Sequence, residues 1–165
     1  MRRLFLTFFY SGLSPKAPGT AGSLLALVVG VLILRYLSLE TLFLATVLLT
    51  LVGISTINAY EADGGEHDDK SIVIDEVVGL WLALVLSSTT WIQILLSFAF
   101  FRLFDIWKPS LIGNIDKDVK GGAGVIGDDL LAGVLAGLCS ASVYQGLHSL
   151  NISLNLNMTL FLDTF

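Results

Sequence analysis

The residues best suited to chemistry gather between positions 101 and 133, in a stretch that separates two long apolar runs. They include Arg102, Asp105, Lys108, Asp116, Asp118, Asp128 and Asp129, and the same stretch contains six glycines. Charged groups beside apolar segments are costly to bury, so they persist where they have a partner or a function. Carboxylates mixed with arginine and lysine beside a glycine-rich turn suit a divalent cation that holds a phosphate. We therefore expect a metal-dependent phosphate site at a membrane surface.

The composition is that of an integral membrane protein. The chain has 165 residues, of which 55% are hydrophobic and 14% charged, and its mean hydropathy is +0.82. Uncharged runs fill 17–34, 41–60, 77–101 and, apart from His148, 130–162. Runs of about 18 or more apolar residues predict membrane helices. We expect one all-α membrane domain over residues 1–165, a helical bundle whose polar site is formed by loops and helix ends at one membrane face.

Several classes of function are disfavoured. The net charge of −5 comes mostly from acids in two loops, and no basic stripe predicts nucleic-acid binding. Cys139, the only cysteine, lies in an apolar run, which excludes an intrachain disulfide and argues against a thiol nucleophile. The N-terminal stretch lacks a cleavage site, so we interpret it as retained. Nothing in the sequence indicates a protein partner.

The N-terminal region predicts an interfacial segment and a loop. Residues 1–14 form a candidate interfacial helix, with Arg2 and Arg3 at the lipid headgroups and four aromatic side chains facing lipid: Phe5, Phe8, Phe9 and Tyr10. The loop 14–23 contains two prolines, and Thr20 or Ser23 is the expected N-cap of the next helix. Such a loop can also bind an anion, and the residues alone leave both interpretations open.

The run 77–101 predicts either one spanning helix or a hairpin broken at 87–90. With a hairpin, eight basic residues share one side, namely Arg2, Arg3, Lys16, Lys70, Arg102, Lys108, Lys117 and Lys120, and only Arg35 lies opposite. That asymmetry is typical of a cytoplasmic face. We therefore predict the hairpin, with the acidic loops all on the cytoplasmic side.

Two segments present an acidic pair at the start of an apolar helix. Asp75-Glu76 opens one helix, and Asp128-Asp129 is predicted to cap the last long helix, 130–147. In the 91–107 helix, Arg102 and Asp105 share a face, and Pro109 ends that helix. Oxygen ligands of this kind suit Mg²⁺ better than zinc. The alternative is a set of ion pairs between loops, but the acids outnumber the nearby cations.

The residues also resemble a known family. SGLSPKAPGTAGS, HDDKSIVIDEVVG and FRLFDIWKP…IDKDVKGGAGVIGDDLLAG are similar to the three signature blocks of the phosphatidylglycerophosphatase A family, in order and spacing. The resemblance implies an all-helical, Mg²⁺-dependent lipid phosphatase of the bacterial inner membrane, which converts phosphatidylglycerophosphate, an anionic phospholipid, to phosphatidylglycerol. The chain departs from the family pattern at Asp69-Lys70, Leu111 and Gly127, which concerns headgroup fit more than the reaction.

With this resemblance, the candidate site residues take expected roles. The expected Mg²⁺ ligands are Asp68, Asp75, Glu76, Asp105, Asp128 and Asp129, and the expected phosphate-binding residues are Arg102, Lys108, Thr20 and Ser23. His67 or a carboxylate such as Asp129 is the candidate general base. Water attack and a phospho-aspartate intermediate both stay open, with Asp116 a weaker candidate for phosphorylation.

A Mg²⁺-binding membrane transporter is the alternative from another functional class. A transporter is expected to carry its acidic residues near the middle of the membrane. The acidic pairs of this chain are expected at helix ends, which favours the enzyme.

Overall fold

The computed structural model describes residues 1–66, 69–87, 90–109, 112 and 119–149, and no β-strand occurs among them. The elements in order are α1 (Arg2–Leu6), the short 3-10 helix η1 (Ser11–Leu13), α2 (Pro18–Tyr36), α3 (Leu39–Ala62), α4 (Ile74–Ser87), α5 (Trp91–Trp107) and α7 (Gly122–Ser149). The prediction of an all-α bundle is therefore confirmed.

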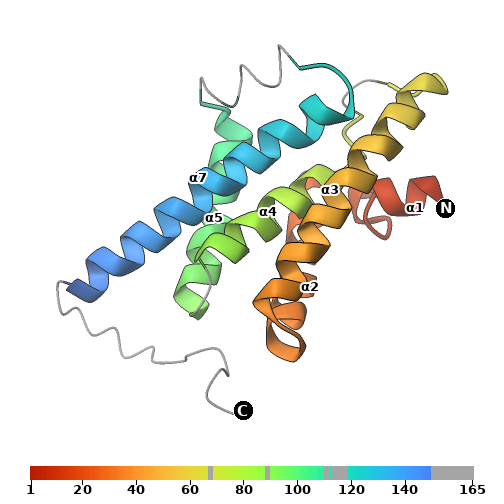
Figure 1. Cartoon of the computed structure of the whole chain (residues 1–165). Helices are drawn as coiled ribbons and strands as arrows, with labels where there is room; N and C mark the ends of the chain where they lie inside the picture. The colour runs from red at the N-terminus through yellow and green to blue at the C-terminus, as the bar shows by residue number, and fades with distance from the viewer. Residues whose placement is uncertain (67–68, 88–89, 110–111, 113–118, 150–165) are drawn as a thin grey trace.

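Helix α4 is the centre of the bundle, with α5 and α7 on one side and α2 and α3 on the other (Figure 1). Nine of its residues are buried, among them Val77, Val78 and Leu84. The indole of Trp81 donates a hydrogen bond of 2.8 Å to the Ala26 carbonyl of α2. A helix that is apolar on all sides is stable only where neighbours cover it, which explains the central place of α4.

The predicted hairpin is confirmed. Helix α4 ends at Ser87 and α5 begins at Trp91, after Thr90, whose hydroxyl accepts a hydrogen bond from the Gln93 amide. The hydroxyls of Ser87 and Ser97 form a hydrogen bond between the two arms. Neither arm is a full-length span, because α4 has 14 residues and α5 has 17.

Helices α4 and α7 touch through their backbones. A Cβ added to Gly133 of α7 would lie 2.1 Å from the Gly79 carbonyl oxygen of α4, which no side chain can tolerate. One turn further along α7, Gly137 packs against Ala83 and Leu86. Gly133 and Gly137, two small residues four positions apart on one face of α7, therefore bring the two helices close together.

Two predicted helix starts, those of α2 and α7, were wrong. Helix α2 begins at Pro18, so Thr20 and Ser23 lie inside its first turns and neither is its N-cap. Helix α3 begins after Ser38, whose side chain accepts a hydrogen bond from the Thr41 amide, and it runs on to Ala62. Helix α7 begins at Gly122, so Asp128 and Asp129 lie in its second turn instead of capping it.

The N-terminal segment also differs from the single helix that we predicted. Helix α1 ends at Leu6, and Phe8, Phe9 and Tyr10 then adopt left-handed backbone angles. Phe8 is not lipid-facing, because it is 6% exposed and packs edge-on against Trp81. Phe9 and Tyr10 are exposed, at 66% and 55%. The turn is held by the Thr7 hydroxyl, which accepts a hydrogen bond from the Tyr10 amide.

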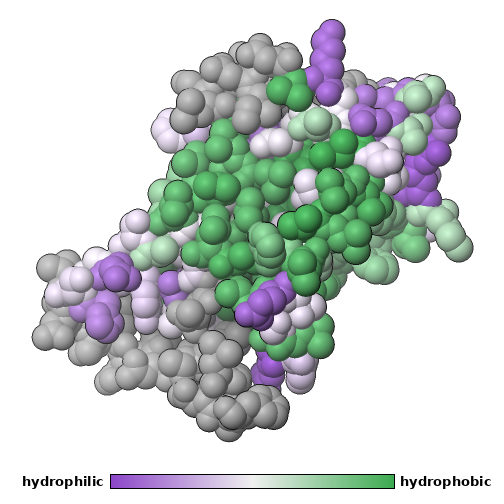
Figure 2. Space-filling view, in the orientation of Figure 1, coloured by the Kyte–Doolittle hydropathy of each residue, from purple (hydrophilic) through white to green (hydrophobic). Residues whose placement is uncertain are grey.

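The outer surface of the bundle is apolar. Helices α2, α3 and α7 are each long and apolar enough to cross a membrane. Their outer faces expose large hydrophobic side chains, including Val28, Leu48, Leu51 and Leu138. Figure 2 shows hydrophobic residues over the middle of one face, with hydrophilic residues toward the ends. This distribution is typical of a bundle that lies in a bilayer.

The helices run so that the starts of α2, α4 and α7 meet the ends of α3 and α5 (Figure 1). Seven basic residues of the described chain lie at or near this end: Arg2, Arg3, Lys16, Lys70, Arg102, Lys108 and Lys120. Arg35 lies at the opposite end, in the last turn of α2. Lys117 is outside the described residues.

The hairpin predicts which loops share a side of the membrane. In a Cys139→Ser background, cysteines placed at Lys16, Lys70 and Lys120 should all react with a membrane-impermeant thiol reagent from one side. A cysteine at Leu37, beyond the far end of α2, should react only from the other side. Labelling of position 120 and position 70 from opposite sides would contradict the hairpin.

The contact between Gly79 and Gly133 predicts a cost for any side chain there. Gly133→Ala should lower the thermal midpoint of the protein in detergent, because the added methyl group meets backbone, and overpacking costs about 1–3 kcal/mol. Gly146→Ala is the matched control, since no atom lies within 4 Å of its added Cβ. It should leave the midpoint unchanged or raise it, because alanine favours a helix by about 1 kcal/mol over glycine. Equal midpoints for the two variants would contradict the tight contact.

Candidate active site

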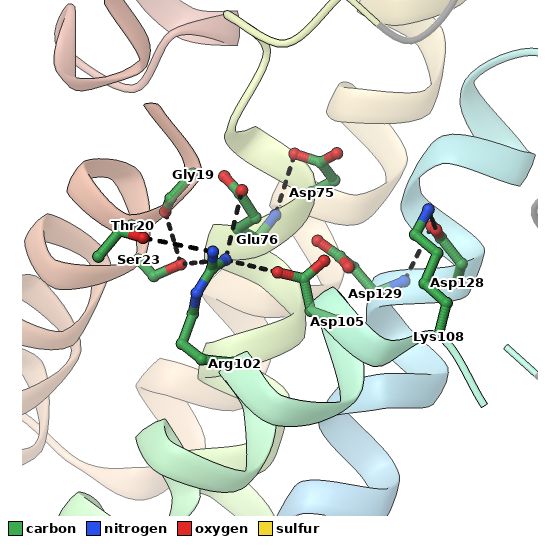
Figure 3. A network of polar contacts seen from close by, with 10 residues as sticks. All are labelled: Gly19, Thr20, Ser23, Asp75, Glu76, Arg102, Asp105, Lys108, Asp128 and Asp129. Atoms are coloured by element: carbon green, nitrogen blue, oxygen red, sulfur yellow. Dashed lines mark hydrogen bonds and ion pairs between the residues drawn. The ribbon is translucent and has the colours of Figure 1, made fainter. Parts of the chain in front are cut away.

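A cavity of about 690 Å³ opens where the helix ends meet. Its charged lining comes from α4, α5, α7 and the segments that follow α3 and α5: Asp69, Lys70, Asp75, Glu76, Arg102, Asp105, Lys108, Asp128 and Asp129. The first turn of α2 adds Pro18, Gly19 and Thr20. Charged groups far apart in the sequence therefore share one polar space, and Figure 3 shows how those from Asp75 to Asp129 lie around it.

Arg102 is the cationic centre of one wall. Its Nη1 lies 2.5 Å from Asp105 Oδ2, one turn along α5, and 3.5 Å from Glu76 Oε1 of α4. These three side chains are largely buried, at 13–16% exposure. Two acids on different helices thus hold the plane of the guanidinium, as a preoriented anion-binding group requires.

The start of α2 supports Arg102 from the other direction. The Ser23 hydroxyl lies 3.3 Å from Arg102 Nη1 and donates to the Gly19 carbonyl, while the Thr20 hydroxyl lies 3.4 Å from Nη2 (Figure 3). Thr20 lines the cavity, whereas Ser23 is fully buried and is not part of its lining. The two hydroxyl side chains predicted to bind phosphate, Thr20 and Ser23, are therefore near Arg102, but only Thr20 lines the cavity.

Gly19 is a site residue that the sequence analysis missed. A Cβ at this position would lie 2.0 Å from Glu76 Oε1, so only glycine lets this carboxylate approach the start of α2. Negative charge is stabilised near the N-terminus of a helix by its dipole. The Pro-Gly pair before an apolar helix was visible as a turn signal, but nothing local showed which side chain it would face.

Lys108 and Asp128 form the opposite wall. Lys108 Nζ lies 2.8 Å from Asp128 Oδ2, which joins the end of α5 to α7. Lys108 caps α5 with a left-handed backbone (φ 43°), just before Pro109, which ends the helix as predicted. Asp128 and Asp129 are 4% and 3% exposed, so both carboxylates are well shielded from bulk water.

The first turn of α7 is fixed by a residue of another helix. The Gly122 amide donates a hydrogen bond of 2.7 Å to the Asn58 side-chain oxygen of α3. Because Asn58 supplies this cap, the helix starts six residues before Asp128. The predicted capping by Asp128-Asp129 was wrong for this reason, and the two acids face α4 from within α7.

The acids of the cavity outnumber its cations. Asp75, Glu76, Asp105, Asp128 and Asp129 line it together with Arg102, Lys108 and the exposed Lys70. Asp75 and Asp128 each accept a hydrogen bond from the next backbone amide in their own helix. The second carboxylate oxygen of Glu76, Oε2, is buried and has no hydrogen-bond partner among the described residues. A buried carboxylate oxygen without a partner is costly, and a cation would offset that cost.

The donor set fits a hard divalent cation, since all of these ligands are carboxylate oxygens. Within the described part of the chain, no three acidic, histidine or cysteine side chains are already gathered as a metal-ligand group. The carboxylates of the cavity would therefore have to turn toward a cation in order to bind one.

Asp69 lines the same cavity and was not among the predicted ligands. Burial opposes ionisation of its carboxyl group, but hydrogen bonds from the Ser71 amide and the Tyr60 hydroxyl outweigh burial and lower its pKa. Asp69 is thus held as a carboxylate. Its neighbours His67 and Asp68, the predicted base and ligand, lie outside the described residues, as do Asp116 and Asp118.

Comparisons with known proteins identify relatives of this chain. A phosphatidylglycerophosphatase A of Haemophilus influenzae is 42% identical over 129 residues, which cover 78% of this chain and 79% of the relative. The phosphatidylglycerophosphatase A of Escherichia coli is 39% identical, over 78% of this chain and 74% of its own length. A Bacteroides thetaiotaomicron protein, provisionally named a phosphatidylinositol-3-phosphatase, is 42% identical, over 78% and 84%.

No solved structure matches the chain significantly. The family model for phosphatidylglycerophosphatase A matches residues 4–144, a range that contains every side chain described above as lining the cavity. The chain is therefore an enzyme of the phosphatidylglycerophosphatase A family.

Proposed function

We propose that this protein removes the terminal phosphate of phosphatidylglycerophosphate in a Mg²⁺-dependent hydrolysis, at the cytoplasmic face of a bacterial inner membrane. The observation that carries this proposal is the acid-rich cavity at one end of an apolar bundle, with Arg102 fixed between Glu76 and Asp105. The names of two relatives supply the substrate. The excess of basic residues at the same end supports the cytoplasmic orientation.

Arg102 and Lys108 are the phosphate-binding groups in this proposal. The guanidinium can hold two phosphate oxygens with its planar fork, and Lys108 adds a point charge from the opposite wall. Thr20 adds a hydroxyl from the cavity wall. Ser23, which is buried behind Arg102, positions the guanidinium and does not reach the phosphate.

The acids of α4, α5 and α7 would hold Mg²⁺, with Asp75, Glu76, Asp105, Asp128 and Asp129 as the described ligands and Asp68 as a further one. When bound, the ion neutralises charge on the phosphoryl oxygens and lowers the pKa of a water molecule. Glu76 contributes its unpartnered buried oxygen. Asp128 is already oriented by Lys108, which limits the side-chain motion needed for binding.

The reaction also requires proton transfer. In hydrolysis by water, the attacking oxygen loses a proton, the phosphorus–oxygen bond to glycerol breaks, and the glycerol oxygen gains a proton. Asp129 is a candidate acceptor because it lines the cavity and is shielded from bulk water, and His67 is the second candidate. A phospho-aspartate intermediate would instead require one of the carboxylates to attack phosphorus, and both routes stay open.

A second headgroup has a specific observation in its favour. The Bacteroides relative, provisionally named a phosphatidylinositol-3-phosphatase, is as similar to this chain as the Haemophilus relative. Both lipids carry a phosphomonoester on a polyol headgroup, so the same cavity chemistry suits either one. We favour the glycerophosphate headgroup because two relatives carry that name.

Purified protein should release phosphate from phosphatidylglycerophosphate in detergent micelles, lose this activity in EDTA and regain it when Mg²⁺ is added. Phosphatidylinositol 3-phosphate, measured in parallel, should be hydrolysed at least about tenfold more slowly. Faster hydrolysis of phosphatidylinositol 3-phosphate would instead identify the inositol lipid as the substrate.

The same assay tests the role of Asp129. The variant Asp129→Asn keeps the size of the side chain and removes one carboxylate. It should lose at least about 100-fold in rate, a typical cost of removing a general base or metal ligand, while its thermal midpoint stays near that of the parent protein. Retained activity with lost stability would make Asp129 structural.

Arg102 and Asp105 share one face of α5 but should do different work. Arg102→Lys keeps the charge and loses the fork, so it should lower kcat with little change in the Mg²⁺ concentration needed for half-maximal rate. Asp105→Asn should raise that Mg²⁺ concentration because a ligand becomes neutral. Titrating Mg²⁺ against rate for both variants checks the assignment. If only Arg102→Lys shifts the Mg²⁺ requirement, the two roles are reversed.

A further inference from the structure

A second cavity lies beside the catalytic one. It has a volume of about 430 Å³, and its polar lining consists of Arg2, Arg3, Thr7, Tyr60, Asp69 and Ser71. Asp69 and Ile72 line both cavities, so the segment that leads into α4 is their common wall. The second cavity is therefore a neighbour of the acid-rich cavity and has two arginines in place of its cluster of acids.

The walls of this cavity are tied together by hydrogen bonds. The Val73 amide donates to the Leu6 carbonyl (2.9 Å), which fixes the end of α1 to the wall segment. Arg2 Nη1 binds Asp63 and the Ala59 carbonyl, which fixes α1 to the end of α3. Arg2 thus has a structural task, and Arg3 is the lining arginine best placed to take a ligand.

The acid in the shared wall is held by hydrogen-bond donors of the protein. Asp69 accepts hydrogen bonds from the Tyr60 hydroxyl (2.7 Å) and from the Ser71 amide (2.9 Å). Its charge is therefore spread over donors from two sides. Arg3 adds a favourable electrostatic interaction with the same carboxylate. The hydroxyls of Thr7 and Ser71 are further polar groups of the lining.

Exposed apolar and aromatic side chains near the second cavity indicate where it lies relative to lipid. Leu4 of α1 and the aromatic side chains of Phe9 and Tyr10, which follow α1, are exposed. Phe9 and Tyr10 have left-handed backbone φ angles of 57° and 67°. Exposed aromatic residues of this kind favour the interface between lipid and water. An interfacial position of these aromatic side chains would bring the arginines of α1 to the level of the lipid phosphates.

We infer that the second cavity binds the phosphodiester group of the lipid substrate, through Arg3, while the phosphomonoester occupies the catalytic cavity. This inference rests on the proposed function, because phosphatidylglycerophosphate carries one phosphate of each kind, separated by a glycerol unit. The two neighbouring cavities would each receive one of the two phosphate groups of a single headgroup. Recognition of the diester selects lipids in which a polyol separates the scissile phosphate from the diacylglycerol.

The diester takes no part in bond breaking, which gives Arg3 a distinct kinetic signature. An interaction that is equal in the ground state and the transition state changes KM and leaves kcat unchanged. Phosphatidylglycerol, a product of the reaction, retains the diester and lacks the monoester. Inorganic phosphate, the other product, has no diester and tests the catalytic cavity alone.

The experiment compares Arg3→Gln with Lys120→Gln, in micelles of an uncharged detergent at saturating Mg²⁺. Lys120 is the matched control, because it is an exposed cation at the same end of the bundle and lines neither cavity. Arg3→Gln should raise KM for phosphatidylglycerophosphate and Ki for phosphatidylglycerol about tenfold, the typical effect of losing one charge-assisted hydrogen bond. Its kcat and its Ki for inorganic phosphate should not change, and Lys120→Gln should change none of the four.

Three results would overturn the inference. The first is an unchanged Ki for phosphatidylglycerol in Arg3→Gln. The second is an equal rise in both inhibition constants, and the third is an equal effect of Lys120→Gln; either of these would make Arg3 a general surface charge. If Arg3→Gln lowers the thermal midpoint, Arg3→Lys replaces it, with a smaller rise expected in Ki for phosphatidylglycerol alone. A parent protein that fails to hydrolyse phosphatidylglycerophosphate would refute the proposed function itself.

Discussion

The backbone contact between α4 and α7 is the constraint on which the site depends. Gly79 and Gly133 let the two helices approach until the carbonyl oxygen of one fills the place of a side chain on the other. One turn away, this approach brings the start of α4, with Asp75 and Glu76, beside Asp128 and Asp129. Four acids on two helices can share one cavity only because no side chain separates the helices at the crossing.

The four acids repel one another, and nearby cations of the protein offset only part of this negative charge. Arg102 and Lys108, both near the end of α5, each pair with acids from a neighbouring helix. The remaining excess of negative charge and the unpartnered oxygen of Glu76 call for a further cation. In the proposed function, a divalent cation would offset this excess of negative charge and would let an anionic phosphate bind beside the acids.

The membrane explains why this chemistry sits at the helix ends. Helices α2, α3 and α7 present apolar side chains to lipid along their length, and charge in that zone would be costly. Charged groups at the ends reach both water and the lipid headgroups. The N-terminal segment has the same arrangement. Two of its arginines line the second cavity, and two of its aromatic side chains are exposed.

The sequence alone was enough to predict the features that depend on local rules. Long apolar runs predicted the membrane bundle, the charge asymmetry predicted the hairpin between α4 and α5, and Pro109 predicted the end of α5. Tertiary structure decided where the other helices begin and which side chains meet. Asn58 caps α7 from another helix, so Asp128 and Asp129 lie inside it, and Gly19 admits the Glu76 carboxylate. Such contacts join residues more than 50 positions apart, and no local pattern encodes them, because their energy exists only once the helices are packed.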